Sequence, residues 1–573
     1  MYSLPKKFYQ DMYKTFIMYT KQLRSFALLC IVFLIFIGCD KKKNEVAHLE
    51  EQKPPNIIFI LTDDQRWDAI GYAKNTLAHT PEMDKLAENG IYFKNAIATT
   101  PICSASRASI ISGLQERTHN YSFSTGSIKE EYMVNAFPRL LKQSGYYTGF
   151  YGKFGVKYGN LDSLYFQHED YDLRYDRKDR SSYYYKTLGN DTVHLTRYTG
   201  EKALEFIKDA PHASDNTVEQ YFWQEENNHI LENNTIPEAD ISSDEVYNKL
   251  PQIVKDGFNR SRWFWRYDTP GKYQHSVKGY YRMIAGIDNE IKKIRDLLKS
   301  KDLADNTIII LMGDNGYFMG ERQIAGKWLM YDNSIRVPLI IYDPRNLNHK
   351  EIEDMALNTD VPSTILDFAG VTVPKSWHGK SLKPFVDEKN IKLERDTILI
   401  EHLWDFKNIA PSEGVRTKDW KYFRYVNDKT IEELYNLNED PKEINNLAEN
   451  ENYHEILEKL RASCNNLIKK YQDPFAFNPQ DLEFKDNSFS WVLSPNSQKQ
   501  SAYQILVSSS KEKLDNNIAD IWDSNKIESS DNIHSINKAF DLKTDRNYFW
   551  KLRLYDENNR TGEYSAPNKI DLK

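Results

Sequence analysis

Several unbroken apolar runs, bounded by polar turns, lie in the first two thirds of the chain. Runs of this kind are typical of strands buried on both faces of a sheet. Between them, apolar residues recur at helical spacing over 81–89 and 281–299. Strands that alternate with helices predict an α/β fold with a doubly wound sheet over 55–396. The predicted strands are 56–61, 146–151, 307–311 and 337–342.

The pattern changes twice towards the C-terminus. From about residue 397 short segments alternate polar and apolar positions, which predicts a small antiparallel subdomain over 397–474. After Pro474, several short alternating runs are separated by turn residues. This spacing predicts a separate fibronectin-like β-sandwich over 475–573.

The N-terminus has the pattern of an export signal. Lys21 and Arg24 precede an apolar run over 26–37, which is too short to span a bilayer, and Gly38-Cys39 follows. We interpret 1–39 as a signal peptide with a lipobox, 40–54 as a tether, and Met18 as an alternative start. Lipidation of Cys39 would anchor the protein to the membrane. We therefore expect a bacterial cell-envelope lipoprotein, in the periplasm or at the outer-membrane surface.

Composition excludes some classes of protein. A formal net charge of −7 with 28% charged residues argues against a nucleic-acid-binding protein. Cys103 and Cys464 are the cysteines that remain beyond the export signal, so no disulfide framework is expected.

Two acidic pairs follow predicted strands. Asp63 and Asp64 come after 56–61, and Asp314 with Asn315 comes after 307–311. A cluster of carboxylates favours a cation, and all-oxygen ligation suits Ca²⁺, or Mg²⁺, rather than zinc. Helix capping by aspartate is an alternative explanation for either pair alone.

Cys103 begins a Cys-x-Ala-x-Arg pentapeptide that ends at Arg107 and opens a helix rich in small residues. A lone cysteine is usually an inert core residue. Here, however, residues 54–460 resemble the type I sulfatases, whose fold is alkaline-phosphatase-like. The segment 475–573 resembles the N-terminal β-sandwich of bacterial α-L-rhamnosidases. The sulfatase motifs are Asp63-Asp64-Gln65, Thr80-Pro81-Glu82-Met83-Asp84, the Cys103 pentapeptide, Gly152-Lys153, Gly313-Asp314-Asn315-Gly316, Lys327 and Arg336-Val337-Pro338.

The resemblance implies roles for individual residues. Cys103 would be oxidised by a separate maturase to formylglycine (3-oxoalanine), whose hydrate is the nucleophile and which completes the metal shell. Arg107 would hold this hydrate. Lys153, His212 and Lys327 would contact the sulfate or its leaving oxygen, and His212 or Lys327 would supply a proton. The calcium ligands would be Asp63, Asp64, Asp314 and Asn315.

Two features depart from the family. Gly155 stands where many members have a histidine two residues after the lysine, and the apolar strand that normally precedes Pro211-His212 is missing. His402 either lines the substrate pocket or is a core histidine.

The expected function is removal of sulfate esters from a polysaccharide or its oligosaccharides, with ulvan, a polymer that contains sulfated rhamnose, as the best candidate. A phosphonate or phosphate ester hydrolase of the same superfamily and a non-catalytic sugar-binding lipoprotein are the alternatives.

Overall fold

The computed structural model describes residues 2–3, 54–123, 125–170, 185–188, 191–208, 221–387, 391–406, 408–472, 480–493, 500–536, 542–543, 546–556 and 564–570. The chain forms two compact units, Met1–Ile468 and Lys469–Lys573. Most of the predicted signal and tether, Cys39 included, and His212 lie outside the described residues. None of the helices among these residues is long and apolar enough to cross a membrane.

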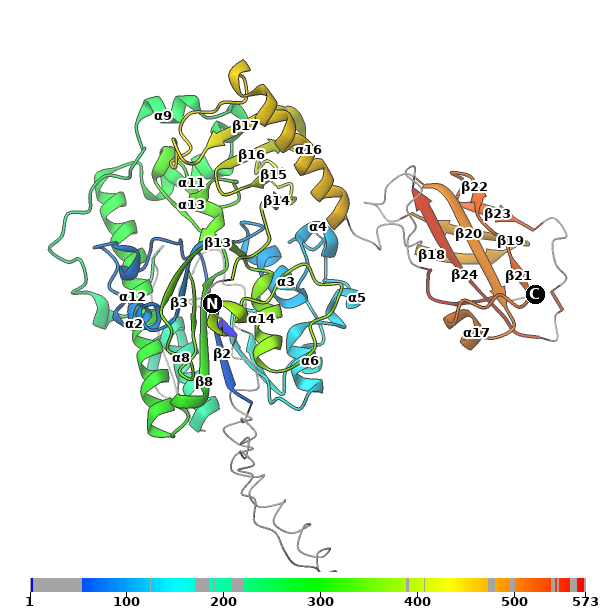
Figure 1. Ribbon diagram of the computed structural model, residues 1–573, viewed down its shortest axis with the longest axis horizontal. Helices are drawn as coiled ribbons and strands as arrows, with labels where there is room; N and C mark the ends of the chain where they lie inside the picture. Colours follow the sequence, from blue (N-terminus) through cyan, green and yellow to red (C-terminus); the bar gives the residue numbers. More distant parts are fainter. Residues whose placement is uncertain are drawn as a thin grey trace, which may run out of the picture. The chain divides into compact units, whose positions relative to one another are not determined.

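A sheet of mixed strand direction forms the centre of the first unit (Figure 1). Its strand order is β1-β2-β8-β12-β3-β11, and β13 pairs with β3. β2 and β8 are parallel, whereas β12 runs antiparallel to both of its neighbours. The strands are β1 Tyr2–Ser3, β2 Asn56–Thr62, β3 Ile91–Ile97, β8 Thr307–Gly313, β11 Arg336–Val337, β12 Leu339–Tyr342 and β13 Lys350–Leu357.

Helices cover both faces of this sheet, which confirms the predicted α/β class (Figure 1). One face carries α2 Pro81–Glu88, α8 Leu195–Lys208 and α12 Pro270–Ser300, whose apolar side chains pack on Ile58 and Ile60. The other face carries α3 Cys103–Ser112, α6 Phe137–Gln143 and α14 Asp360–Phe368. Successive residues of β2 point to opposite faces, so an unbroken apolar run is needed to serve both layers.

Three details differ from the sequence-based expectations. The strand expected at 337–342 is interrupted by Pro338, which cannot donate a ladder hydrogen bond, and becomes β11 and β12. β12 is antiparallel because the segment 314–335 contains only short elements and no crossover helix. The strand expected at 146–151 is the shorter β4 Gly149–Gly152, which pairs with β5 Gln167–Asp170 in a separate two-stranded sheet.

Shorter elements connect these layers. They are α4 Glu116–His119, α5 Glu130–Met133, β6 Tyr185–Leu188, β7 Asp191–His194, α9 Asp244–Lys249, α10 Gln252–Lys255, α11 Phe258–Arg266, β9 Phe318–Met319, β10 Ala325–Gly326, α13 Asp332–Ile335 and α15 Lys383–Asp387.

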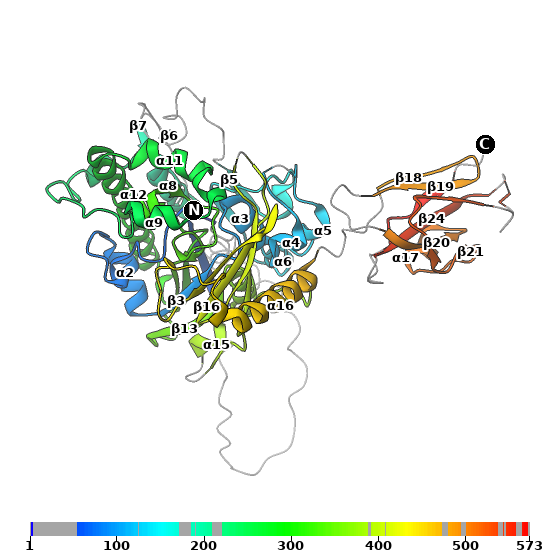
Figure 2. The same ribbon diagram turned by 90° about the horizontal axis from the view of Figure 1, so that it is seen from above.

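The predicted antiparallel subdomain is a four-stranded sheet in the order β14-β15-β16-β17. A long helix, α16 His454–Tyr471, lies along this sheet (Figure 2) and buries Leu457, Leu460 and Cys464. The strands are β14 Ile398–His402, β15 Ser412–Arg416, β16 Trp420–Tyr425 and β17 Asp428–Asn436.

The second unit is a β-sandwich, as the alternating pattern predicts. One sheet has the order β18-β19-β23, and the other has the order β21-β20-β24-β25 with β22 beside β20. Trp491, Trp550 and Phe489 belong to the apolar core between them. The elements are β18 Gln480–Lys485, β19 Ser488–Val492, β20 Gln500–Ser508, α17 Lys511–Asp515, β21 Trp522–Asp523, β22 Ile527–Glu528, β23 Ile533–Ser535, β24 Tyr548–Asp556 and β25 Asn568–Ile570.

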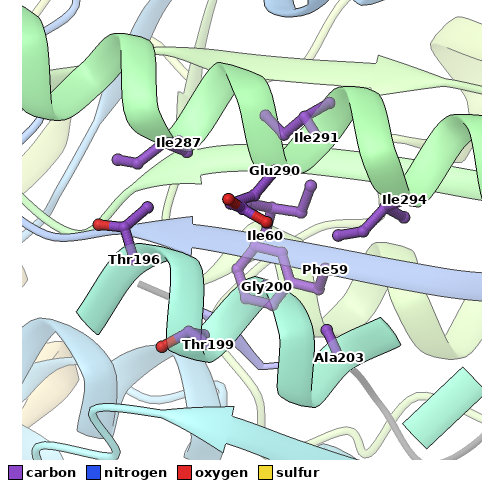
Figure 3. A pocket seen from close by; sticks show the side chains of 10 residues that line it. All are labelled: Phe59, Ile60, Thr196, Thr199, Gly200, Ala203, Ile287, Glu290, Ile291 and Ile294. Carbon is purple, nitrogen blue, oxygen red and sulfur yellow. The ribbon is translucent and has the colours of Figure 1, made fainter. Parts of the chain in front are cut away.

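A small cavity of about 30 Å³ lies between β2, α8 and α12 (Figure 3). Its lining is apolar except for Thr196, Thr199 and Glu290. One Glu290 oxygen accepts hydrogen bonds from Gln224 at 3.2 Å and Lys293 at 2.9 Å, while the other has no partner in the described part of the chain. Burial raises the pKa of Glu290 to about 7, so this carboxyl titrates near neutral pH.

Candidate active site

The two acidic pairs meet at the carboxyl ends of β2 and β8. The parallel register places Thr62 beside Gly313, so the residues that follow each strand emerge at the same edge. Oxygens of Asp63, Asp64 and Asp314 lie within 4.8 Å of one another. The Asp64 backbone amide donates to Asp314 Oδ1 at 3.0 Å, which ties the two strand ends together.

Three side-chain cations surround these carboxylates. Arg107 Nε donates to Asp314 Oδ2 at 2.9 Å, and a second Arg107 nitrogen lies 3.5 Å from Asp63 Oδ1. Lys153 Nζ donates to both Asp63 oxygens at 2.9 and 3.1 Å. Lys327 Nζ forms an ion pair with Asp64. The predicted residues therefore converge, although they come from five separate segments.

This convergence adds ion pairs that the sequence analysis did not anticipate. Arg107, Lys153 and Lys327 supply one positive charge for each of the three carboxylates. Burial acts to raise the pKa of Asp63, yet Lys153, Lys327 and Arg107 hold it well below its ordinary value. Asp63 therefore stays ionised beside these cations. A divalent cation would leave the cluster with a net positive charge.

The donor set nevertheless fits such a cation. Two oxygens bound to the same Ca²⁺ at about 2.4 Å lie at most about 4.8 Å apart, which matches the spacing of these carboxylates. Asn315 adds a further oxygen nearby, because its Oδ1 lies 3.2 Å from Lys327 Nζ and its Nδ2 donates to Asp64 at 2.7 Å. All of these donors are hard oxygen ligands, as Ca²⁺ and Mg²⁺ prefer.

Cys103 is the first residue of α3 and is buried with 6% exposure. Cys103 and Cys464 are both free thiols, as expected. Arg107 lies one turn further along α3, on the same face of the helix as Cys103. Burial alone would lower the pKa of Lys327, but Asp64, a Cys103 thiolate and Asp63 raise it above its ordinary value. Lys327 therefore stays protonated close to Cys103.

Gly155 has a physical reason to be glycine. Its φ of +70° lies in the left-handed region, and a Cβ there would meet Arg107 Cδ at 2.8 Å. The same Cβ would lie 3.7 Å from Lys153 Cε, so the position faces the candidate site. A histidine at residue 155 would therefore have to adopt this left-handed backbone, and Arg107 would have to shift to make room for its Cβ.

Several residues that the sequence analysis did not single out position this site. Asn259 of α11 donates to the backbone oxygens of Ala325 and Lys327 at 3.0 and 2.9 Å. The Tyr280 hydroxyl donates to the Asp64 backbone oxygen at 2.9 Å. Ser106 Oγ donates to the Asp314 backbone oxygen at 2.6 Å. These contacts join segments far apart in the sequence. Ser106 occupies a variable position of the Cys103 pentapeptide, and no local motif marks Asn259 or Tyr280.

A cluster of aromatic side chains lies beside the start of α3, where Cys103 stands. Trp404 stacks on Phe406 with ring centroids 4.5 Å apart and meets Phe123 edge-on at 5.3 Å. Phe123 is 44% exposed and Phe406 is 37% exposed. Trp404 also packs on the apolar cluster that contains Ile102 and Trp328. Ile102 directly precedes Cys103, and Trp328 directly follows Lys327. Exposed aromatic faces of this kind suit the apolar faces of sugar rings.

The sequence analysis named two histidines, His212 and His402, as possible contacts of the substrate. His212 lies outside the described residues. His402 is fully buried, burial lowers its pKa to about 3, and neither ring nitrogen has a hydrogen-bond partner within the described ranges. His402 is thus a neutral histidine of the protein interior.

Comparison with known proteins agrees with this geometry. The sulfatase family model matches residues 55–371, and the model of the C-terminal region of N-sulphoglucosamine sulphohydrolase matches 320–470. The N-terminal immunoglobulin domain of Rha78A-like proteins matches 474–572. This last match confirms the predicted resemblance to rhamnosidase domains.

Individual relatives cover most of the chain. An N-acetylglucosamine-6-O-sulfatase of Bacteroides thetaiotaomicron is 26% identical over 76% of this chain and 90% of its own length. An ulvan-active sulfatase of Formosa agariphila is 24% identical over 78% of this chain and 87% of its own length.

Solved structures show the same fold. A protein in complex with its substrate D-glucosamine-2-N,6-O-disulfate superposes with a TM-score of 0.57 at 21% identity, over 73% of this chain and 98% of that one. The phosphonate monoester hydrolase of Agrobacterium radiobacter gives 0.60 at 19% identity, over 75% and 98%. Over half of the chain matches the sulfatase model, and the family's Cys-x-Ala-x-Arg helix lies beside the acidic cluster. The chain therefore belongs to the sulfatase family and is a sulfuric ester hydrolase.

Proposed function

We propose that this protein removes sulfate esters from a sulfated polysaccharide or its oligosaccharides, with formylglycine at position 103 and Ca²⁺ held by Asp63, Asp64, Asp314 and Asn315. The main support is the position of Cys103, at the start of α3 beside three carboxylates and three cations. With one divalent cation this group would be net positive, and a sulfate ester carries one negative charge.

The residues of the chain have separate tasks in this proposal. Lys153 and Lys327 bind the sulfate oxygens and stabilise their charge from fixed positions. Lys327 also donates a proton to the leaving oxygen; burial lowers its pKa, but the nearby Asp64 raises it and keeps Lys327 protonated. Arg107 orients the group at position 103, and Asp314 holds Arg107 in place.

The two implied groups would supply the remaining chemistry. A bound divalent cation supplies Lewis acidity and lowers the pKa of a nucleophilic hydroxyl. Formylglycine supplies a hydrated aldehyde whose second hydroxyl allows the sulfate to be expelled. We propose that a separate maturase makes this modification.

Sulfated rhamnose oligosaccharides from ulvan are the substrate we favour. Two ulvan-active sulfatases of Formosa agariphila are among the relatives, at 24% and 25% identity. The second unit matches a domain of Rha78A-like proteins. The exposed aromatic rings of Phe123 and Phe406 suit a sugar ring beside the site. We also propose that Cys39 carries a lipid anchor and holds the protein in the cell envelope, where such polymers are degraded.

Phosphonate monoester hydrolases share the fold, so the fold alone does not separate the two activities. The alternative activity is that of a phosphonate or phosphate ester hydrolase with threonine or serine as nucleophile, or with histidine among its metal ligands. The acidic cluster of the described residues contains aspartates alone, and a cysteine stands at position 103. Both features favour a sulfatase.

The experiment is to co-express the chain with a maturase and to measure sulfate release by ion chromatography. The substrates are ulvan oligosaccharides, N-acetylglucosamine 6-sulfate and a phenyl phosphonate ester. The mass of the peptide that contains Cys103 reports conversion of the thiol to the aldehyde. We expect conversion and release of sulfate from ulvan oligosaccharides. Cleavage of the phosphonate without release of sulfate would refute the proposal, and release from the glucosamine alone would refute ulvan.

A further inference from the structure

Arg262, on α11, is a cation without an anionic partner beside the candidate site. Its Nη2 donates to the Tyr317 hydroxyl at 3.1 Å, and its Nε is buried without a hydrogen-bond partner among the described residues. No carboxylate of the described chain lies within ion-pair distance of Arg262. Placing a guanidinium in such a half-buried position without a counter-charge costs free energy, and a bound anion would offset this cost.

The position of Arg262 connects it to the reaction centre. Its guanidinium carbon lies 4.9 Å from the Trp328 ring centroid and 5.8 Å from that of Tyr317. Trp328 directly follows Lys327, and Tyr317 lies two residues after Asn315. A Cβ on Gly326 would lie 3.3 Å from the guanidinium, which is a tight contact, so the glycine lets Arg262 approach this segment closely. Arg262 therefore lies against both segments that carry the proposed sulfate and metal residues.

The surroundings of Arg262 suit a sugar that carries a charge. Trp328, with 6% exposure, has an indole N–H without an acceptor in the described structure. Phe258 packs between Trp328 and Trp265, with ring centroids 5.9 and 5.5 Å away, and Trp265 is 51% exposed. Donors without acceptors thus lie next to exposed aromatic faces.

We propose that Arg262 binds a second anionic group of the substrate, the carboxylate of a uronate residue or another sulfate ester, and so selects saccharides that carry such a group. This inference rests on the proposed function for its sugar substrate. It adds a determinant of specificity that is separate from Arg107, Lys153 and Lys327. All three of those cations already have carboxylate partners, whereas Arg262 has none in the described chain.

The test compares matched ligands. Full-length protein with Cys103→Ser, loaded with Ca²⁺, is titrated calorimetrically with a sulfated oligosaccharide that contains a uronate and with the same molecule after reduction of the carboxylate to the alcohol. A second pair carries one or two sulfate esters. The protein with Arg262 should bind the member of one pair that carries the second anionic group about 10- to 100-fold more tightly than the other member. This is the range expected for a charged hydrogen bond. The pair that shows the preference identifies the anion.

Arg262→Gln should remove this preference, and Arg262→Lys should keep part of it because the charge remains. Arg260→Gln is the matched control, since Arg260 on the same helix lies over Tyr247, Trp263 and Phe264 and donates to Gln323. In the active enzyme, Arg262→Gln should raise KM for the charged substrate with little change in kcat. It should leave turnover of 4-methylumbelliferyl sulfate, which has no anionic group besides its sulfate ester, unaltered.

Two outcomes would overturn the proposal. One is equal affinity of the Arg262 protein for both members of each pair. The other is an equal loss of affinity in Arg262→Gln for ligands with and without the second anionic group, which indicates a packing role against Trp328. Absence of sulfate release from every substrate would contradict the proposed function instead, while the calorimetric comparison would still test Arg262.

Discussion

Removal of the Asp314 carboxylate tests how the site is held together. Asp314 is fully buried, accepts from Arg107 and from the Asp64 amide, and is the strongest partner of an arginine with 2% side-chain exposure. Loss of one member of a buried ion pair costs about 3–5 kcal/mol, because the other charge is left uncompensated. Arg107 keeps a weaker contact with Asp63 at 3.5 Å, so we expect about 3 kcal/mol for Asp314→Ala.

The control is Asp63→Ala. The Asp63 side chain is 27% exposed, so water can replace part of what Lys153 loses, and we expect about 1 kcal/mol. Both free energies are measured by urea unfolding in the presence of a chelator, which removes any contribution from a bound metal. Both variants should lose sulfate release when Ca²⁺ is restored. Two results would refute this reasoning. The two variants could unfold at the same urea concentration, or the free energy of unfolding of Asp314→Ala could lie within about 1 kcal/mol of the wild-type value; in either case burial of the Arg107–Asp314 ion pair does not control stability.

Further predictions follow from the same contacts. Cys103→Ala or Cys103→Ser should abolish sulfate release with an unchanged melting temperature; turnover by either variant would exclude formylglycine chemistry. Gly155→Ala should cost about 1–2 kcal/mol and lower kcat, because φ is +70° and Arg107 is displaced, whereas Gly159→Ala, with open space around it, should do neither. The stability that protonated Glu290 contributes is complete below pH 4.5 and is lost as the pH rises through about 7. The melting temperature of Glu290→Gln should therefore fall less than that of wild type as the pH rises from 5 to 8. Parallel plots of melting temperature against pH for the two proteins would contradict the raised pKa. A chain that ends at Pro474 should keep its activity on small oligosaccharides; a folded but inactive product would show that the sandwich contributes to catalysis.

Much of the architecture follows from local pattern. The unbroken apolar run of β2 and the helical spacing within α12 predict buried strands and covering helices, because each element must bury a face of matching period. The pair Asp63-Asp64 and the pentapeptide from Cys103 to Arg107 are contiguous in sequence, so their chemistry was readable as motifs. The alternation after Pro474 likewise predicts a sandwich.

Long-range packing determined the ion pairs of the site, the direction of β12 and the position of Arg262. The sequence alone did not show that Lys153, Lys327 and Arg107 would neutralise the carboxylates, because ion pairs between residues 90 to 263 positions apart depend on how the strands and helices are placed. The antiparallel direction of β12 depends on the absence of a crossover helix, and the position of Arg262 against Trp328 depends on the docking of α11. A local pattern determines which face of an element is buried, whereas the partner of each charged side chain is determined by tertiary contacts.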